Sequence, residues 1–185
     1  MISINTALVA SLAAAALAVP ARAAADPTFN AFATVCGDTR ADFAAVAAAA
    51  DAQGWRRSDV VAESSMPGVA VAERLSRELK AGDTSLTLSA WRGATKSGVQ
   101  VSACTVRVAK PDFAGLHDAA QAWTGFAPQD DAATKAIFRF TDTASAHKAL
   151  VSGEYDAAAA GTGMEILTVS GDNHGAVVDL LKIKK

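Results

Sequence analysis

The chain has 185 residues, with 17 lysines and arginines against 19 aspartates and glutamates and a formal net charge of −2. A nearly neutral, slightly acidic chain has no electrostatic reason to prefer nucleic acid or anionic lipid, so we expect no nucleic-acid partner. The length suits one domain with a proper hydrophobic core and leaves little room for two.

Residues 1–23 are predicted to be a cleavable secretory signal peptide. An uncharged apolar run from Thr6 to Val19 precedes Pro20 and then Ala21-Arg22-Ala23, the small-x-small pattern of a cleavage site. The run is about 14 residues long, whereas a membrane-spanning helix needs roughly 20. A membrane anchor is therefore the less favoured alternative, and we expect no stable membrane insertion after cleavage. Cleavage after Ala23 and cleavage after Ala25 both fit the pattern.

The mature chain, residues 24–185, is expected to be a single α+β domain in the periplasm or outside the cell. Its two cysteines, Cys36 and Cys104, are 68 residues apart in the sequence. In an oxidising compartment an even number of cysteines favours a disulfide, with two buried free thiols as the alternative. A disulfide would leave neither sulfur available as a nucleophile, which excludes a cysteine hydrolase.

Apolar spacing and capping residues predict three helices. Phe29 and Phe32 suit a short first helix over Thr28–Val35. Asp38 or Thr39 can cap a second helix that Gly54 ends. The third helix is expected from Pro111-Asp112 through Trp123, with Gly125 after it.

The segment Val69–Lys80 is ambiguous between helix and strand. Val71, Leu75 and Leu79 are four residues apart, which favours a helix. Val69 and Val71 alternate with small or polar residues, which would suit a strand. We expect a helix here and keep the strand as the alternative.

Strands are predicted where polar and apolar residues alternate. These segments are Thr84–Trp91, Val99–Val108, Lys135–Thr141, Met164–Ser170 and Ala176–Lys184. Ala144–Ser152 is expected to be a short helix or a loop, and Gly171–Gly175 a turn. Because hairpins outnumber crossovers, the predicted fold is α+β: an antiparallel sheet of about five strands with helices packed on one face.

No pattern in the sequence identifies a catalytic, cofactor or metal site. His117, His147 and His174 have no second histidine or cysteine at ligand spacing, so a zinc site is unsupported. Asp172-Asn173-His174-Gly175 has the residues of a hairpin turn and lacks the later glutamate of a calcium loop. Trp55, Trp91 and Trp123 are expected to pack in the core, with a ligand groove as the alternative.

One resemblance supports export. Phe32 and Cys36, an alanine-rich helix, Gly54-Trp55 and a later cysteine in mid-strand, Cys104, resemble small alanine-rich exported bacterial proteins of unknown function. The resemblance covers the N-terminal two-thirds of the mature chain. It implies export and a disulfide and brings no activity, cofactor or functional residue.

Export, near-neutral charge, a disulfide and the lack of a catalytic motif favour a non-catalytic binding module. Its partner would be a protein or a small-molecule ligand in the cell envelope. The alternative is an exported hydrolase with a dispersed site, in which His117, His147 or His174 acts as the base. A third hypothesis is an anchored structural protein of the envelope.

Overall fold

The computed structural model describes residues 26–59, 66–81, 83–109, 112–143, 146–172 and 175–185. The predicted signal peptide and His174 lie outside these residues. Along the described chain the helices are α1 (Pro27–Phe32), the π-helical turn η1 (Ala33–Gly37), α2 (Phe43–Ala52), α3 (Phe113–Thr124), the 3₁₀ turn η2 (Ser152–Glu154) and α4 (Tyr155–Ala160). The strands are β1 (Arg56–Arg57), β2 (Val69–Ala81), β3 (Thr84–Thr95), β4 (Gln100–Val108), β5 (Asp130–Ala132), β6 (Lys135–Asp142), β7 (His147–Ala149), β8 (Met164–Asp172) and β9 (Gly175–Lys184).

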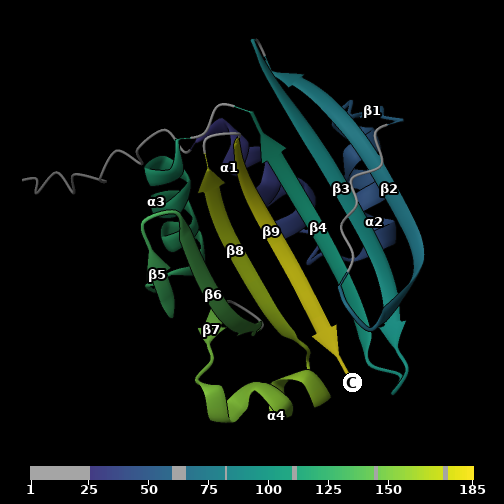
Figure 1. The fold of residues 1–185 in the computed structure, drawn as a ribbon, viewed down its shortest axis with the longest axis vertical. Helices are drawn as coiled ribbons and strands as arrows, with labels where there is room; N and C mark the ends of the chain where they lie inside the picture. The colour runs from purple at the N-terminus through teal and green to yellow at the C-terminus, as the bar shows by residue number, and fades with distance from the viewer. Residues whose placement is uncertain (1–25, 60–65, 82, 110–111, 144–145, 173–174) are drawn as a thin grey trace, which may run out of the picture.

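The strands form one antiparallel sheet, as predicted, but the expected number of about five was too small. Nine strands of the described chain pair in the order β1-β2-β3-β4-β9-β8-β6-β5, with β7 also paired to β6 (Figure 1). Three of the missed strands, β1, β5 and β7, have only two or three residues. Strands this short contain too few residues to show an alternating pattern of polar and apolar side chains.

The prediction of a helix over Val69–Lys80 is wrong, because this segment is the long strand β2. It pairs with β3 along its whole length, from Val69 opposite Thr95 to Ala81 opposite Thr84. Residues four apart share a face of a strand as well as a face of a helix, since four is an even number of residues. The spacing of Leu75 and Leu79 therefore could not distinguish the two structures.

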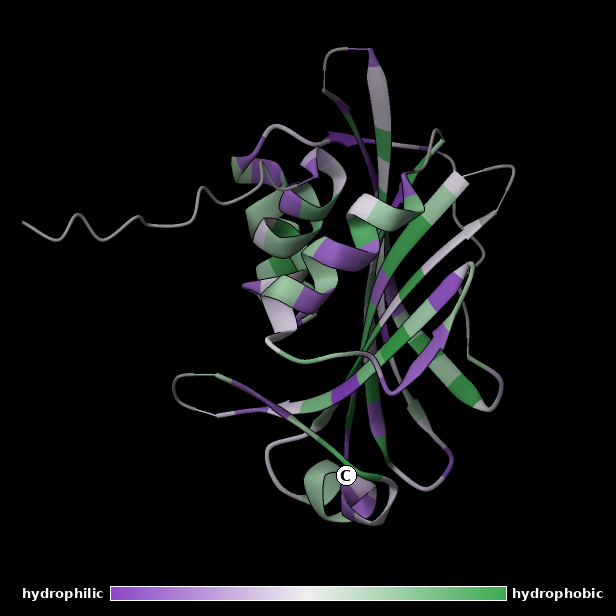
Figure 2. Ribbon diagram, turned by 90° about the vertical axis from the view of Figure 1, so that its left-hand side faces the viewer, coloured by the Kyte–Doolittle hydropathy of each residue, from purple (hydrophilic) through white to green (hydrophobic). Residues whose placement is uncertain are grey.

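The core lies between the sheet and the layer formed by α1, η1, α2 and α3. Strand register places Leu88 of β3, Val106 of β4 and Val178 of β9 on one face of the sheet, and all three are fully buried. They pack in one cluster with residues of these helices, including Phe32, Val46 and Leu116. Figure 2 turns the molecule so that these helices are seen on one side of the strands.

The opposite face of the sheet carries a smaller apolar cluster. Trp91 of β3 packs there with Val101 and Ala103 of β4, and Leu181 of β9 adds a partly buried side chain. Trp91, Val101 and Ala103 are each less than a twentieth exposed. The sheet is therefore apolar on both sides near the junction of β3 and β4.

Aspartates cap the N-termini of α1, α2 and α3. Asp26 accepts hydrogen bonds from the amides of Thr28 and Phe29, and Asp112 accepts one from Gly115. Asp42, and not the expected Asp38 or Thr39, caps α2 by accepting from the amide of Ala45. The Thr39 hydroxyl instead donates to the carbonyl oxygens of Val35 and Cys36, which closes the preceding turn η1.

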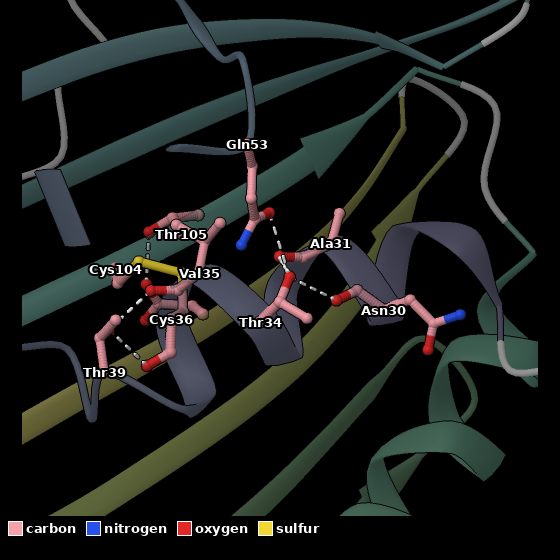
Figure 3. Close-up of a disulfide and its surroundings, with 10 residues drawn as sticks. Asn30, Ala31, Thr34, Val35, Cys36, Thr39, Gln53, Cys104 and Thr105 are labelled. Atoms are coloured by element: carbon pink, nitrogen blue, oxygen red, sulfur yellow. Dashed lines mark hydrogen bonds between the residues drawn. A yellow bond between two sulfur atoms is a disulfide. The ribbon is translucent and has the colours of Figure 1, made fainter. Parts of the chain in front are cut away.

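A disulfide fastens the helical layer to the sheet. Cys36 in η1 and Cys104 in β4 lie with their Sγ atoms 2.01 Å apart, and both residues are fully buried (Figure 3). The predicted pairing is therefore present. Because β4 lies near the middle of the sheet, the bond holds the segment between α1 and α2 over the sheet's centre.

Removing this disulfide should strongly lower the stability of the fold. The bond joins residues 68 apart in the sequence and so restricts the conformations of the unfolded chain. We expect the double change Cys36→Ala and Cys104→Ala to lower the free energy of unfolding by about 4 kcal/mol, mainly through the entropy of the unfolded chain. Urea unfolding of the oxidised protein, the reduced protein and the double variant would measure it. A loss below about 1 kcal/mol in both the reduced and the substituted protein would contradict the expectation.

Candidate ligand-binding site

Of the histidines considered as a possible catalytic base, His147 is the one that the described structure places in a dense group of charged residues. Its Nδ1 atom lies 2.5 Å from Oδ1 of Asp142, and the imidazole packs 4.2 Å from Trp123 between ring centroids. Arg40 forms ion pairs with Asp142 and, at 3.5 Å, with Glu165. Lys182 completes the cluster through its Nζ atom, 3.3 Å from Oε1 of Glu165.

The turn that presents Arg40 to this cluster has an unusual backbone. Arg40 and Ala41 have φ angles of 55° and 52°, in the left-handed region that residues with a side chain rarely occupy. Ala41 is 1 % exposed, and its amide donates to the carbonyl oxygen of Cys36. The disulfide-linked turn and the start of α2 thus hold both residues in this conformation.

Burial and charge act differently on the two carboxylates of the cluster. Burial acts to raise the pKa of Asp142, but the hydrogen bond from His147 and the charge of Arg40 outweigh it and lower that pKa below its usual value. Burial raises the pKa of Glu165, and the Asp142 carboxylate raises it further; Lys182 and Arg40 only partly offset this. The cluster therefore favours one ionised carboxylate beside a carboxyl that resists ionisation.

Chemically, Asp142 and His147 make the base-and-orienter pair that many hydrolases use. Hydrolysis through a covalent intermediate also needs a hydroxyl or thiol within hydrogen-bond reach of the imidazole. Within the described ranges, the contacts of His147 are Asp142, Trp123 and Phe140, and none of these supplies such a group. Among the described residues, then, no hydroxyl or thiol forms a hydrogen bond with His147, and its imidazole packs on two aromatic rings.

His117 lies on α3, away from His147. Its Nδ1 and Nε2 atoms are 3.3 Å from Asp118 and 3.4 Å from Asp131 respectively. Over the part of the chain that the structure describes, no three histidine, cysteine, aspartate or glutamate side chains gather as metal ligands. The predicted turn at Gly171–Gly175 lies partly outside that part, and His174 lies outside it.

The three tryptophans occupy different environments. Trp55 packs in the main core and Trp123 lies partly buried between that core and His147. Trp91 also lines the larger of two surface hollows described below, although it is 4 % exposed. Core packing is thus the main role of Trp55, and Trp91 packs on the face of the sheet opposite the helices.

A hollow of about 480 Å³ lies where the edge of the sheet meets α2. We call it the α2–β2 cleft. It is lined by Phe43 and Ala47 of α2, Arg57, Ser58 and Asp59 at and after β1, Arg74–Arg77 of β2 and Ser89–Trp91 of β3. A second, smaller hollow is lined by Asp118, Gln121, Ala122, Gly125 and Phe126, at the outer side and end of α3. The α2–β2 cleft is the better candidate because its lining combines aromatic, apolar and charged groups from both layers.

The composition of the α2–β2 cleft differs from that of the whole chain. Among the described residues that line it, Arg57 and Arg77 project to the side of the sheet that the helices cover, against one acid, Asp59, although the chain as a whole is slightly acidic. Arg74 pairs with Trp91 and projects to the other side of the sheet. Arg77 is 9 % exposed, and its Nε atom lies 3.4 Å from Oδ1 of Asp51 on α2. The cleft thus offers positive charge beside an apolar surface.

The sequence did not indicate these residues as a site. On the helix expected over Val69–Lys80, Arg74 and Arg77 would each lie four residues from an acid, Glu78 and Glu73 respectively, which would neutralise them. A strand assignment for Val69–Ala81 would have separated Arg74 and Arg77 onto opposite faces. Even then, only the pairing of β1 with β2 brings Arg57 beside Arg77.

The chain matches no protein-family model, and comparisons with curated proteins and with solved structures return no significant match. Within the described residues, no helix combines the length and the apolar character that crossing a membrane requires.

Replacing Glu165 should change how stability depends on pH. The carboxyl of an unfolded chain titrates near the ordinary value of 4.5, whereas the folded protein holds the pKa of Glu165 above it. Wild type should therefore lose stability as the pH rises from the lower to the higher value, and Glu165→Gln should not suffer this loss. In urea unfolding between about pH 4 and about pH 8, the free energy of unfolding of the variant should rise relative to that of wild type as the pH increases. Parallel stability curves for the two proteins would refute this expectation.

Proposed function

We propose that the protein is an exported, disulfide-containing domain that acts by binding a small molecule in the α2–β2 cleft. The observation that carries the proposal is the cleft itself. Its volume of about 480 Å³ falls within the range of roughly 300–1,000 Å³ that is typical of small-molecule sites. The lining comes from α2 and three strands, so the fold itself fixes the positions of the side chains.

A binding role is favoured over catalysis by what the two candidate regions contain. The Asp142–His147 pair is wedged against Trp123 and Phe140 and contacts no hydroxyl or thiol among the described residues. Among the described residues, the lining of the α2–β2 cleft holds no histidine or cysteine. Arginines and serines beside aromatic side chains are instead the groups with which proteins orient bound ligands.

Export is supported by residues 1–25 of the sequence and by the disulfide. Disulfides persist in oxidising compartments and are rare in the cytosol. A fully buried bond between η1 and β4 suits a protein that folds outside the cytosol. The periplasm and the extracellular space are both consistent with these features.

Intact mass of the protein purified from the periplasm tests export. We expect loss of residues 1–23 or 1–25, and two thiols that react with an alkylating reagent only after reduction. A full-length mass with two reactive thiols before reduction would show that residues 1–23 are retained and that the disulfide is absent.

A substitution that fills the cleft tests ligand binding. Ala47 of α2 lines the cleft, whereas the adjacent Ala48 is exposed and does not. We expect wild-type protein and Ala48→Trp, purified from the native compartment and then denatured, to release a small molecule that mass spectrometry detects. Ala47→Trp should release roughly tenfold less, because an indole occupies the ligand's volume. Equal release from all three proteins, or no release from any, would overturn binding in this cleft.

A further inference from the structure

Two arginines face each other across the short pairing of β1 and β2. Arg57 is directly opposite Arg77 in the strand register. Directly opposite residues of an antiparallel pair project to the same side of the sheet, and like charges there repel each other. Arg77 pairs in turn with the core residue Leu88 of β3, so this side is the one that the helices cover.

The protein's own groups neutralise this pair incompletely. Arg77 is nearly buried, and its ion-pair partner Asp51 is 64 % exposed, with 3.4 Å between Nε and Oδ1. Its Nη1 atom donates to the carbonyl oxygen of Ser76. Arg57 forms no ion pair within the described residues. A buried guanidinium is usually matched by a well-aligned carboxylate or phosphate with two parallel hydrogen bonds.

The neighbours of the two arginines are apolar. Phe43 and Ala47 of α2 and Leu75 of β2 line the cleft, and Leu75 and Arg77 project to the same side of β2. A ligand whose acidic group lies between the guanidinium groups would bring its remaining atoms against these side chains. An inorganic anion would leave that apolar surface unused.

We propose that the α2–β2 cleft binds an organic anion of small-molecule size. The carboxylate or phosphate of the ligand binds between Arg57 and Arg77, and its apolar part packs on Phe43, Ala47 and Leu75. The inference rests on the proposed function, because it assigns a ligand class to the same cleft. The negative charge of the ligand offsets the repulsion between Arg57 and Arg77. It also gives the Arg77 guanidinium the closely aligned acidic partner that Asp51, at 3.4 Å, provides only in part.

The test uses three probes with the same apolar body: 2-naphthoate, 2-naphthyl phosphate and the neutral 2-naphthol. Binding to the mature protein is measured by isothermal titration calorimetry. The key variant is Arg57→Gln, on the exposed two-residue strand β1. The matched control is Arg56→Gln, which removes the same charge from the adjacent residue. Arg56 pairs with Glu78 and projects to the other side of the sheet.

We expect at least one of the two anionic probes to bind at one site, and 2-naphthol to bind at least tenfold more weakly. Arg57→Gln should weaken binding of that anion by roughly tenfold or more, the loss expected for a charge-assisted hydrogen bond. Arg56→Gln should leave it within about twofold. Whichever anion binds more tightly identifies the acidic group as carboxylate or phosphate.

Three results would overturn the inference. In the first, 2-naphthol binds as tightly as the anions and Arg57→Gln changes none of the affinities. This result would show that the cleft binds apolar molecules whatever their charge. Equal weakening by both arginine variants would show that only the overall charge matters. Failure of every probe to bind would show that the cleft does not bind organic anions. The proposed function would still be supported if wild type, but not Ala47→Trp, released a bound molecule.

Discussion

The attachment of η1 to β4 fixes the positions of the helices that border both charged regions of the molecule. The Cys36–Cys104 bond joins the end of the first helical segment to the sheet near its middle. The turn that follows it places Arg40 in the His147 cluster, and α2 then begins and extends along the cleft. A shift of η1 over the sheet would therefore move both regions together.

The His147 cluster and the α2–β2 cleft differ in how their buried charges are balanced. Around Glu165 the protein supplies both signs: two acids, two bases and a histidine lie in mutual contact. Among the described residues that line the α2–β2 cleft, arginines outnumber acids. The first arrangement is satisfied within the chain, which suits a structural cluster, and the second leaves room for a ligand to complete it.

Much of the fold could be predicted from the sequence, because alternation and helix caps are local signals. The strands Thr84–Trp91 and Val99–Val108 and the helix ending before Gly125 all follow from such signals. The candidate cleft could not be predicted, since its arginines come from β1 and β2, which are brought together only by strand pairing. The same holds for Glu165, whose ion-pair partners Arg40 and Lys182 come from other segments of the chain.

The place of β9 in the sheet has a consequence for how the chain assembles. β9 pairs with β4 on one side and β8 on the other, so the two halves of the sheet meet only through this strand. During synthesis, β4 must wait for a partner that follows about 70 residues later, and meanwhile it is an open edge of the kind that pairs with other chains. Crowded copies that have not yet folded would therefore risk pairing β4 of one molecule with β9 of another, and a chaperone that covers β4 would suppress that exchange.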